Sequence, residues 1–194
     1  MTTDPRPVYA EAAAQIGELI RSVRPGQLDA ATPCPEFTVR KLLSHMVGVL
    51  VRVAVTGEGR DGLAVVAFVE GVDDAEWVAA FEEAHARVEK AWADDALLRE
   101  TVRVPWGEVP GAGALAGYVM ELATHTWDLS EALNWPLELS PEVGEFALAT
   151  GLRALPGPER PAGLPFASAR PAPEGADAYG KLAAWTGREP VRAA

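Results

Sequence analysis

Apolar residues recur every three or four positions along most of this chain, which is the spacing that places them on one face of an α-helix. The pattern predicts helices over about residues 8–23, 39–50, 73–92, 117–131 and 141–155, and a short last helix over 177–185. Alternation typical of a strand is limited to 101–104, inside a Pro- and Gly-rich segment. The sequence therefore predicts an all-α fold, a bundle of amphipathic helices.

Residues with strong positional preferences support these boundaries. Thr38 and Ser140 each stand where a hydroxyl can cap the first turn of a helix, and Gly187 stands where the last helix should stop. The segment 156–175 contains six prolines and is expected to be irregular. We therefore expect a bundle domain over residues 1–155, and over residues 156–194 a proline-rich extension whose short terminal helix packs on the bundle.

Composition narrows the class of protein. With 194 residues, 48% of them hydrophobic and 23% charged, the chain can build one sizeable soluble core. Its formal net charge of −11 would repel phosphate backbones and anionic lipids, so neither nucleic acid nor membrane is an expected partner. The N-terminus lacks a basic stretch followed by an apolar run, so a cytoplasmic location is expected. The sequence does not set the oligomeric state, and a homodimer is compatible with it.

Cysteine usage restricts the kinds of metal site available. Cys34 is the single cysteine, which excludes an internal disulfide and any multi-cysteine metal site. It lies in the rigid segment Thr32–Phe37, between two prolines, and no cationic residue immediately flanks it. We interpret it as a small buried group, not a reactive thiol. Any bound metal would need histidine and carboxylate ligands.

One pair of residues has the spacing of metal ligands. Glu121 and His125 lie one helical turn apart on the edge of the apolar stripe of the helix over 117–131, so both side chains can reach one ion. Spacing alone favours a simpler interpretation, a weak surface contact between the two side chains. His45 lies at the edge of the stripe of the second helix, where a lone histidine is more often structural than a ligand.

Other polar and aromatic residues are weaker candidates. Arg103 and Trp106 precede the helix that carries Glu121 and could form a wall of a pocket and contact a substrate, although Trp106 could equally cover the end of the bundle. Asp128, one turn beyond His125, is a candidate second-shell acceptor or base, or a residue that interacts only with solvent. His85 falls one turn beyond Phe81 and is expected to pack against the core or lie on the surface.

Three motifs in order resemble one known family. TPCPEFTVRKLLSHMV, PWGEVPGAGAL and ELATHTWDLSEAL, with the closing KLAAWTGREP, are similar to the signatures of the DinB-like, mycothiol-dependent maleylpyruvate isomerase N-terminal family. The resemblance runs from about residue 8 to 155, with the tail added. Glu36 stands where the family often has glycine, and the longer C-terminal domain of the full isomerases does not follow. The chain thus resembles the shorter actinobacterial metal-binding relatives, which fits its 14 arginines against 3 lysines.

The resemblance implies a fold, a ligand set and a chemistry. It implies a DinB-like four-helix bundle in which His45, Glu121 and His125 bind a divalent metal ion, usually Zn²⁺, with Ni²⁺ or another ion as alternatives. It also implies mycothiol as a low-molecular-weight thiol cosubstrate and a small electrophile as substrate. Three protein ligands leave an open position at zinc, the pattern of catalytic sites.

Three hypotheses follow. The first is a metal-dependent, thiol-using transferase or isomerase, with Asp128 and Arg103 as candidate catalytic residues. The second is a non-catalytic metal-binding or interaction protein on the same bundle. The third is a purely structural bundle that binds no metal.

Overall fold

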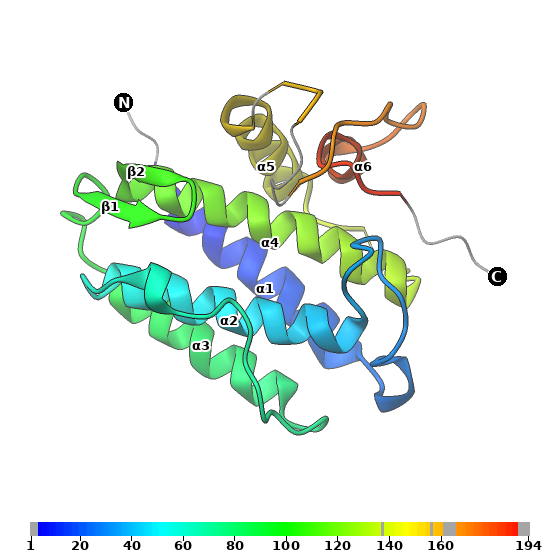
Figure 1. Cartoon of the computed structure of the whole chain (residues 1–194), viewed down its shortest axis with the longest axis horizontal. Coiled ribbons are helices and arrows are strands. Elements are labelled where there is room, and N and C mark those ends of the chain that lie inside the picture. The colour runs from blue at the N-terminus through cyan, green and yellow to red at the C-terminus, as the bar shows by residue number, and fades with distance from the viewer. Residues whose placement is uncertain (1–3, 137, 156, 161–165, 190–194) are drawn as a thin grey trace.

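Four long helices lie side by side, and two further helices pack on one side of them (Figure 1). The computed structural model describes residues 4–136, 138–155, 157–160 and 166–189 of the chain. In this part of the chain the helices are α1 (Arg6–Ser22), α2 (Val39–Gly57), α3 (Trp77–Ala91), α4 (Gly111–Leu133), α5 (Pro141–Ala154) and α6 (Ala178–Trp185), with short 3₁₀ turns η1 (Pro25–Gln27) and η2 (Gly62–Ala64). The all-α bundle predicted from the hydrophobic pattern is confirmed. Part of the proline-rich segment lies outside the described residues, and the domain boundary at 155 stays a prediction.

The helix that carries the candidate ligands begins earlier than the pattern suggested. Strands β1 (Thr101–Val104) and β2 (Gly107–Pro110) form an antiparallel hairpin, and α4 starts directly after it at Gly111. The sequence pattern did not predict a helix in this first turn, because its glycines have a low helix propensity. Gly111 is required by packing, since a Cβ there would lie 2.0 Å from the Leu97 carbonyl oxygen. The start of α4 therefore lies directly against the backbone of the segment that precedes β1.

Helix α2 is longer than predicted and α3 is shorter. Thr38 caps α2 as expected, its hydroxyl accepting a hydrogen bond from the Lys41 amide. The helix then continues to Gly57 because Val53 and Ala54 are fully buried and extend its apolar face. Helix α3 starts at Trp77, and its N-cap residue Glu76 makes no capping hydrogen bond with its side chain.

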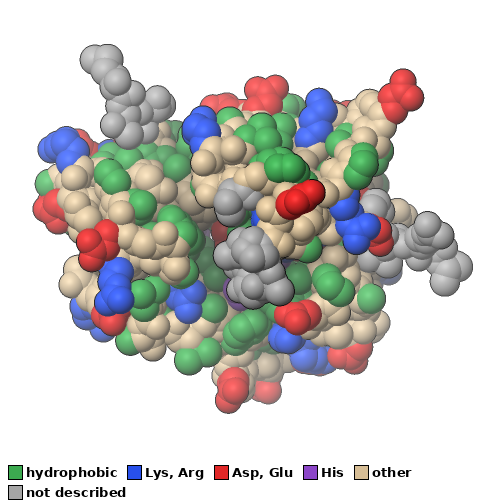
Figure 2. Space-filling view, turned by 45° about the horizontal axis from the view of Figure 1, so that its top comes forward, with side chains coloured by type: hydrophobic (Ala, Val, Ile, Leu, Met, Phe, Trp, Pro, Cys, Tyr) green, Lys and Arg blue, Asp and Glu red, His purple; other side chains and the backbone are tan. Residues whose placement is uncertain are grey.

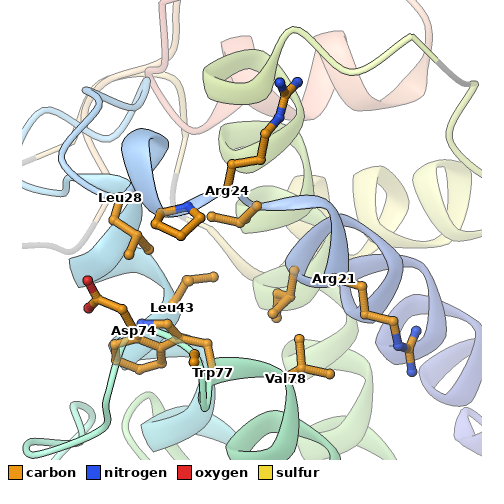
Figure 3. A pocket seen from close by; sticks show the side chains of 11 residues that line it. Arg21, Arg24, Leu28, Leu43, Asp74, Trp77 and Val78 are labelled. Atoms are coloured by element: carbon orange, nitrogen blue, oxygen red, sulfur yellow. The ribbon is translucent and has the colours of Figure 1, made fainter.

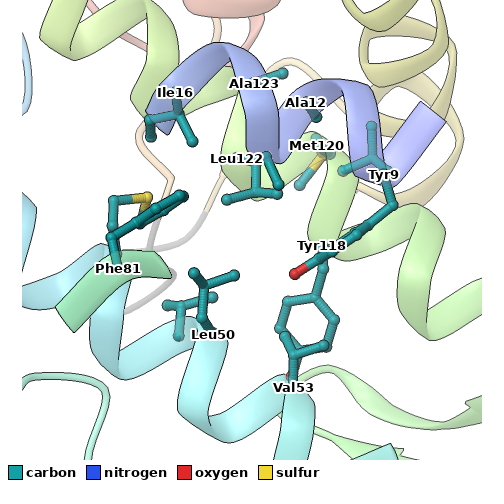
Figure 4. Close-up of a cluster of buried hydrophobic side chains, with 14 of the residues drawn as sticks. Tyr9, Ala12, Ile16, Leu50, Val53, Phe81, Tyr118, Met120, Leu122 and Ala123 are labelled. Carbon is teal, nitrogen blue, oxygen red and sulfur yellow. The ribbon is translucent and has the colours of Figure 1, made fainter. Parts of the chain in front are cut away.

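The core between the helices fixes how α2 and α4 face each other. Figure 4 shows side chains from α1, α2, α3 and α4 pointing toward one another, among them Ile16, Leu50, Phe81 and Leu122. All four are almost completely buried. Burying such side chains removes apolar surface from water, and each buried side chain stabilises the fold by about 1.5–3 kcal/mol. This packing holds the two ligand-bearing helices together.

Helices α5 and α6 pack against α4. Ser140 caps α5 and Asp177 caps α6 through hydrogen bonds from backbone amides. The Tyr179 ring lies against Gly144, where a Cβ would come within 2.8 Å of it. No helix in the described ranges is both long enough and apolar enough to cross a bilayer.

Candidate metal centre

Three side chains that are far apart in the sequence converge between α2 and α4. Nε2 of His45 lies 3.0 Å from Oε1 of Glu121, and Nε2 of His125 lies 3.5 Å from the same oxygen. One ligand atom from each residue lies within 4.8 Å of the other two. The structure therefore brings together the three residues that the sequence and the family resemblance pointed to.

The positions of these residues follow from the helix periodicity. Glu121 and His125 flank Leu122, whose side chain is fully buried on the core face of α4, so both lie at the edge of that face. His45 lies between the buried Leu42 and Met46 on α2. The ligand atoms meet where the edges of the two apolar stripes approach each other.

Hydrogen bonds on the far side of each ring orient the two imidazoles. Nδ1–H of His45 donates to the Ala67 carbonyl oxygen at 2.9 Å, and Nδ1–H of His125 donates to Oδ2 of Asp128 at 2.9 Å. A carbonyl or carboxylate oxygen can only accept, so each Nδ1 carries the proton and each Nε2 is directed at Glu121. Such acceptors are the usual outer partners of metal-bound histidines.

The arrangement calls for a positive charge at its centre. When both imidazoles are neutral, two nitrogen lone pairs and a carboxylate oxygen face one another without a donor among them. Either protons on the imidazoles or a cation must therefore lie between these three atoms. A divalent metal ion meets this requirement with a single group.

The pKa of Glu121 shows how strongly the surroundings favour its anion. Burial alone would raise the pKa of this carboxyl group. Hydrogen bonds from His125 and His45 outweigh burial, so the pKa lies well below its ordinary value. The carboxylate is therefore available as an anionic ligand.

The pKa of His125 moves the other way. Burial opposes its protonation, but hydrogen bonds to Asp128 and Glu121 outweigh burial and raise the pKa above the ordinary value. A proton on His125 consequently competes with a metal ion for Nε2.

Two of the three separations among these atoms fit a small tetrahedral ion. Zinc ligands at about 2.0–2.2 Å from the ion lie roughly 3.3 Å apart in a tetrahedron. The two distances to Glu121 Oε1, 3.0 and 3.5 Å, bracket this value. Two imidazole nitrogens and one carboxylate are also the donor types found in catalytic zinc sites.

Aromatic side chains that the sequence reasoning did not single out enclose the imidazoles. The Phe37 ring lies 5.2 Å from the His45 ring and 5.9 Å from the His125 ring, centroid to centroid. Phe68 lies 5.0 Å from His45 and 5.6 Å from Phe37. Phe37 belongs to the first motif, so the sequence could have indicated that it lies near the site. Residues 67–68 follow no periodic pattern that would have placed them against α2. These rings give the imidazoles apolar neighbours.

Asp128 and a residue from the C-terminal segment continue the network. The Asp128 side chain is completely buried, so the interpretation that it interacts only with solvent is wrong. Arg188 donates from Nε to Oδ1 at 3.4 Å and from Nη2 to Oδ2 at 3.3 Å. Sequence reasoning missed Arg188, although it lies in the closing motif KLAAWTGREP.

The other predicted candidates lie apart from the three candidate ligands. Arg103 is exposed on β1, opposite Glu108 in the hairpin, and no hydrogen bond joins it to the centre within the described residues. Trp106 is 48% exposed and packs on Tyr118, with ring centroids 5.0 Å apart. Tyr118 precedes Glu121 on α4, so Trp106 covers this helix one turn from the ligands. The substrate roles of both residues stay predictions.

His85 has the surroundings that the sequence suggested, whereas Cys34 is less buried than expected. His85 stacks on Phe81 with ring centroids 6.3 Å apart and is not part of the ligand group. Cys34 is a free, half-buried cysteine, and burial raises the pKa of its thiol. A raised pKa keeps the thiol protonated and makes it a weaker nucleophile.

A separate pocket lies near the end of α1. It has a volume of about 160 Å³ and is lined by residues that include Arg21, Leu28, Leu43 and Trp77 (Figure 3). None of the three converging residues lines it, so it is distinct from the candidate metal centre. On the face shown in Figure 2, hydrophobic side chains are interspersed with charged side chains of both signs.

Comparison with known proteins places the chain in a family. The sequence model described as the mycothiol maleylpyruvate isomerase N-terminal domain matches residues 9–130. The chain belongs to the mycothiol maleylpyruvate isomerase N-terminal domain family. The match covers α2, most of α4 and all three converging residues, whereas Arg188 lies beyond it. The family resemblance noted in the motifs is confirmed.

Full-length relatives of this family member exist in mycobacteria. Uncharacterized proteins from two strains of Mycobacterium tuberculosis, CDC 1551 and H37Rv, are each 33% identical to it over 187 residues. The alignments cover 95% of this chain and 98% of each relative, so they include the C-terminal segment. No solved structure matched the chain.

Proposed function

We propose that this protein binds a divalent metal ion, most readily Zn²⁺, through His45, Glu121 and His125, and uses the site to activate a small thiol for transfer to, or isomerisation of, a small electrophile. The observation that carries the proposal is the orientation of both imidazoles. Their Nδ1 atoms are held by Ala67 and Asp128, so that both Nε2 atoms face one carboxylate oxygen.

The chain's own residues supply the parts of such a site. Glu121 contributes the anionic ligand, and Asp128 holds His125 in the tautomer that leaves Nε2 free. Phe37 and Phe68 form an apolar lining that limits water. A divalent metal ion with three protein ligands, when bound, lowers the pKa of a thiol or water at its open position to near neutrality.

Family membership supports mycothiol as the thiol. The name of the matching family refers to mycothiol and to maleylpyruvate isomerase. The proposed partners are therefore mycothiol and a small electrophile, and the C-terminal segment, which lies outside the matched region, is expected to shape which electrophile fits. Ni²⁺ or another divalent ion would satisfy the same donor set, so the metal is to be identified by analysis of the purified protein.

A second function, metal binding without catalysis, is favoured by one observation. The side chains of His45, Glu121 and His125 are only 13%, 20% and 4% exposed. A site so enclosed also suits a metal ion that is bound but never meets a substrate. The two functions share the ligand set and differ in whether a thiol reaches the ion.

Two measurements test the proposal in order. Elemental analysis of the purified chain should give close to one divalent metal ion per molecule, and absence of metal after incubation with Zn²⁺ would refute both functions. The metal-loaded protein is then mixed with mycothiol and a chromogenic electrophile, and conjugate formation is followed. Metal-dependent conjugation supports the enzyme, whereas a fully loaded protein that leaves both reagents unchanged supports the non-catalytic alternative.

A further inference from the structure

A buried chain of polar contacts links the C-terminal segment to the candidate metal centre. Arg188 pairs with Asp128, and Asp128 in turn accepts the hydrogen bond from Nδ1–H of His125 at 2.9 Å. The side chains of these three residues are 7%, 0% and 4% exposed. The side-chain contacts of Asp128 in the described part of the chain are thus one imidazole and one guanidinium.

The end of α6 places Arg188 in this position. The amide of Arg188 donates to the Ala183 carbonyl and the amide of Gly187 donates to the Ala184 carbonyl, the two hydrogen bonds of a Schellman motif. Gly187 has a φ of +81°, a conformation that side chains with a Cβ rarely adopt. The turn reverses the chain at the end of the helix and sends the next side chain back toward α4.

Further contacts hold the guanidinium against Asp128. Its Nη1 donates to the Thr186 carbonyl oxygen at 3.3 Å, and its Cζ lies 5.5 Å from the centroid of the Phe166 ring. A planar guanidinium that contacts both oxygens of a carboxylate fixes the rotation of that carboxylate, not only its charge.

We propose that Arg188 is a positioning residue of the metal centre: it fixes the Asp128 carboxylate, which in turn holds the His125 ring with Nε2 directed at the ion. The inference rests on the proposed metal binding and adds to it a residue outside the matched family region. It makes the C-terminal segment part of the metal centre.

The affinity for metal is the direct measurement. Outer partners of metal-bound histidines typically change metal affinity by about 10–100-fold when they are lost. Arg188 acts on His125 only through Asp128, so Arg188→Met should weaken Zn²⁺ binding, measured by chelator competition, by about 10-fold, the lower end of this range. The visible absorption spectrum of the Co²⁺-loaded protein should also change, because it reports the geometry of the ligands.

A matched control separates positioning from loosening of the segment. Arg170 contacts the Gly187 carbonyl and pairs with Glu189 in the same segment, and in the described part of the chain it makes no hydrogen bond or ion pair with Asp128. Arg170→Met should keep the affinity and the Co²⁺ spectrum of the unmodified protein. An equal loss in both variants would overturn the inference, since docking of the segment would then explain the effect.

A double variant tests whether Arg188 acts through Asp128. In an Asp128→Asn background, Arg188→Met should lower the affinity little further, whereas two independent effects would multiply and contradict the inference. If Arg188→Met does not fold, Arg188→Gln, which keeps an N–H donor but not the charge or the fork, is measured in the same way. Unchanged affinity and spectrum in a folded Arg188 variant would overturn this inference alone, while an unmodified chain without metal would overturn the proposed function as well.

Discussion

Oε1 of Glu121 lies 3.0 Å from Nε2 of His45, although 76 positions separate the two residues in the chain. His125 approaches the same oxygen from one turn along α4. Because Nδ1 of each histidine already donates to another acceptor, the atoms that face Glu121 are the ones free to bind a cation.

Removal of either imidazole should cost most of the bound metal. His45→Gln and His125→Gln each leave two protein ligands, which is fewer than the three that zinc sites with an open position retain. Metal content measured after dialysis should fall to a small fraction of that of the unmodified protein. His85→Gln is the matched control, because His85 lies on α3 outside the ligand group and should leave the metal content unchanged. Full retention of metal in either ligand variant would exclude this ligand set.

Metal affinity should fall on acidification, starting above the ordinary histidine pKa of about 6.5. The pKa of His125 is raised, so its proton competes with the ion at a higher pH than a free imidazole would. Chelator competition between about pH 6 and pH 8 should show weaker Zn²⁺ binding at each lower pH. A pH-independent affinity over this range would show that His125 is not a ligand.

Acidification should weaken metal binding, but it should stabilise the metal-free protein across neutral pH. The raised pKa of His125 contributes stability that is fully present below its unfolded value of 6.5 and is lost as the pH rises through the folded value. The lowered pKa of Glu121 contributes stability that is present above 4.5 and is lost as the pH falls. The melting temperature of the metal-free chain should therefore decrease from weakly acidic to alkaline pH, and less so in His125→Gln. If the melting temperature changed equally steeply with pH in both proteins, the titration of His125 and Glu121 would not be the cause.

Gly48→Ala should weaken both the fold and the metal centre. A Cβ at Gly48 would lie 2.5 Å from the Ala67 carbonyl carbon, and the neighbouring oxygen is the one that orients His45. Overpacking of this kind costs about 1–3 kcal/mol, which chemical denaturation can measure. Gly113→Ala is the control on another helix, because nothing lies closer than 3.7 Å to its added Cβ and alanine favours helix by up to about 1 kcal/mol. If Gly48→Ala proved as stable as Gly113→Ala and bound metal normally, the 67–68 backbone would not be what fixes His45.

The sequence was sufficient for those parts of the protein that follow from local periodicity. The stripes on α2 and α4 predicted that His45, Glu121 and His125 lie at the edges of buried faces, and the structure brings them together. Both N-caps that were named, Thr38 and Ser140, accept the expected hydrogen bonds. These features depend on residues a few positions apart, where spacing carries the information.

The missed contacts are those made by segments without regular spacing. Ala67 and Phe68 reach His45 from an irregular segment, and no pattern specifies where such a segment crosses a helix. Arg188 reaches Asp128 across 60 positions through a turn at Gly187. The glycine itself was recognised as the end of α6, but the direction of the chain after it depends on tertiary packing.

The three candidate ligands come from two different helices, so an ion bound among them would tie α2 to α4. Under the proposed function, occupancy and folding are then linked, and free metal at 100 times its dissociation constant would stabilise the folded chain by about 2.7 kcal/mol. The lifetime of this polypeptide in a cell would then depend on the supply of zinc, since the metal-free chain unfolds more often and is degraded sooner.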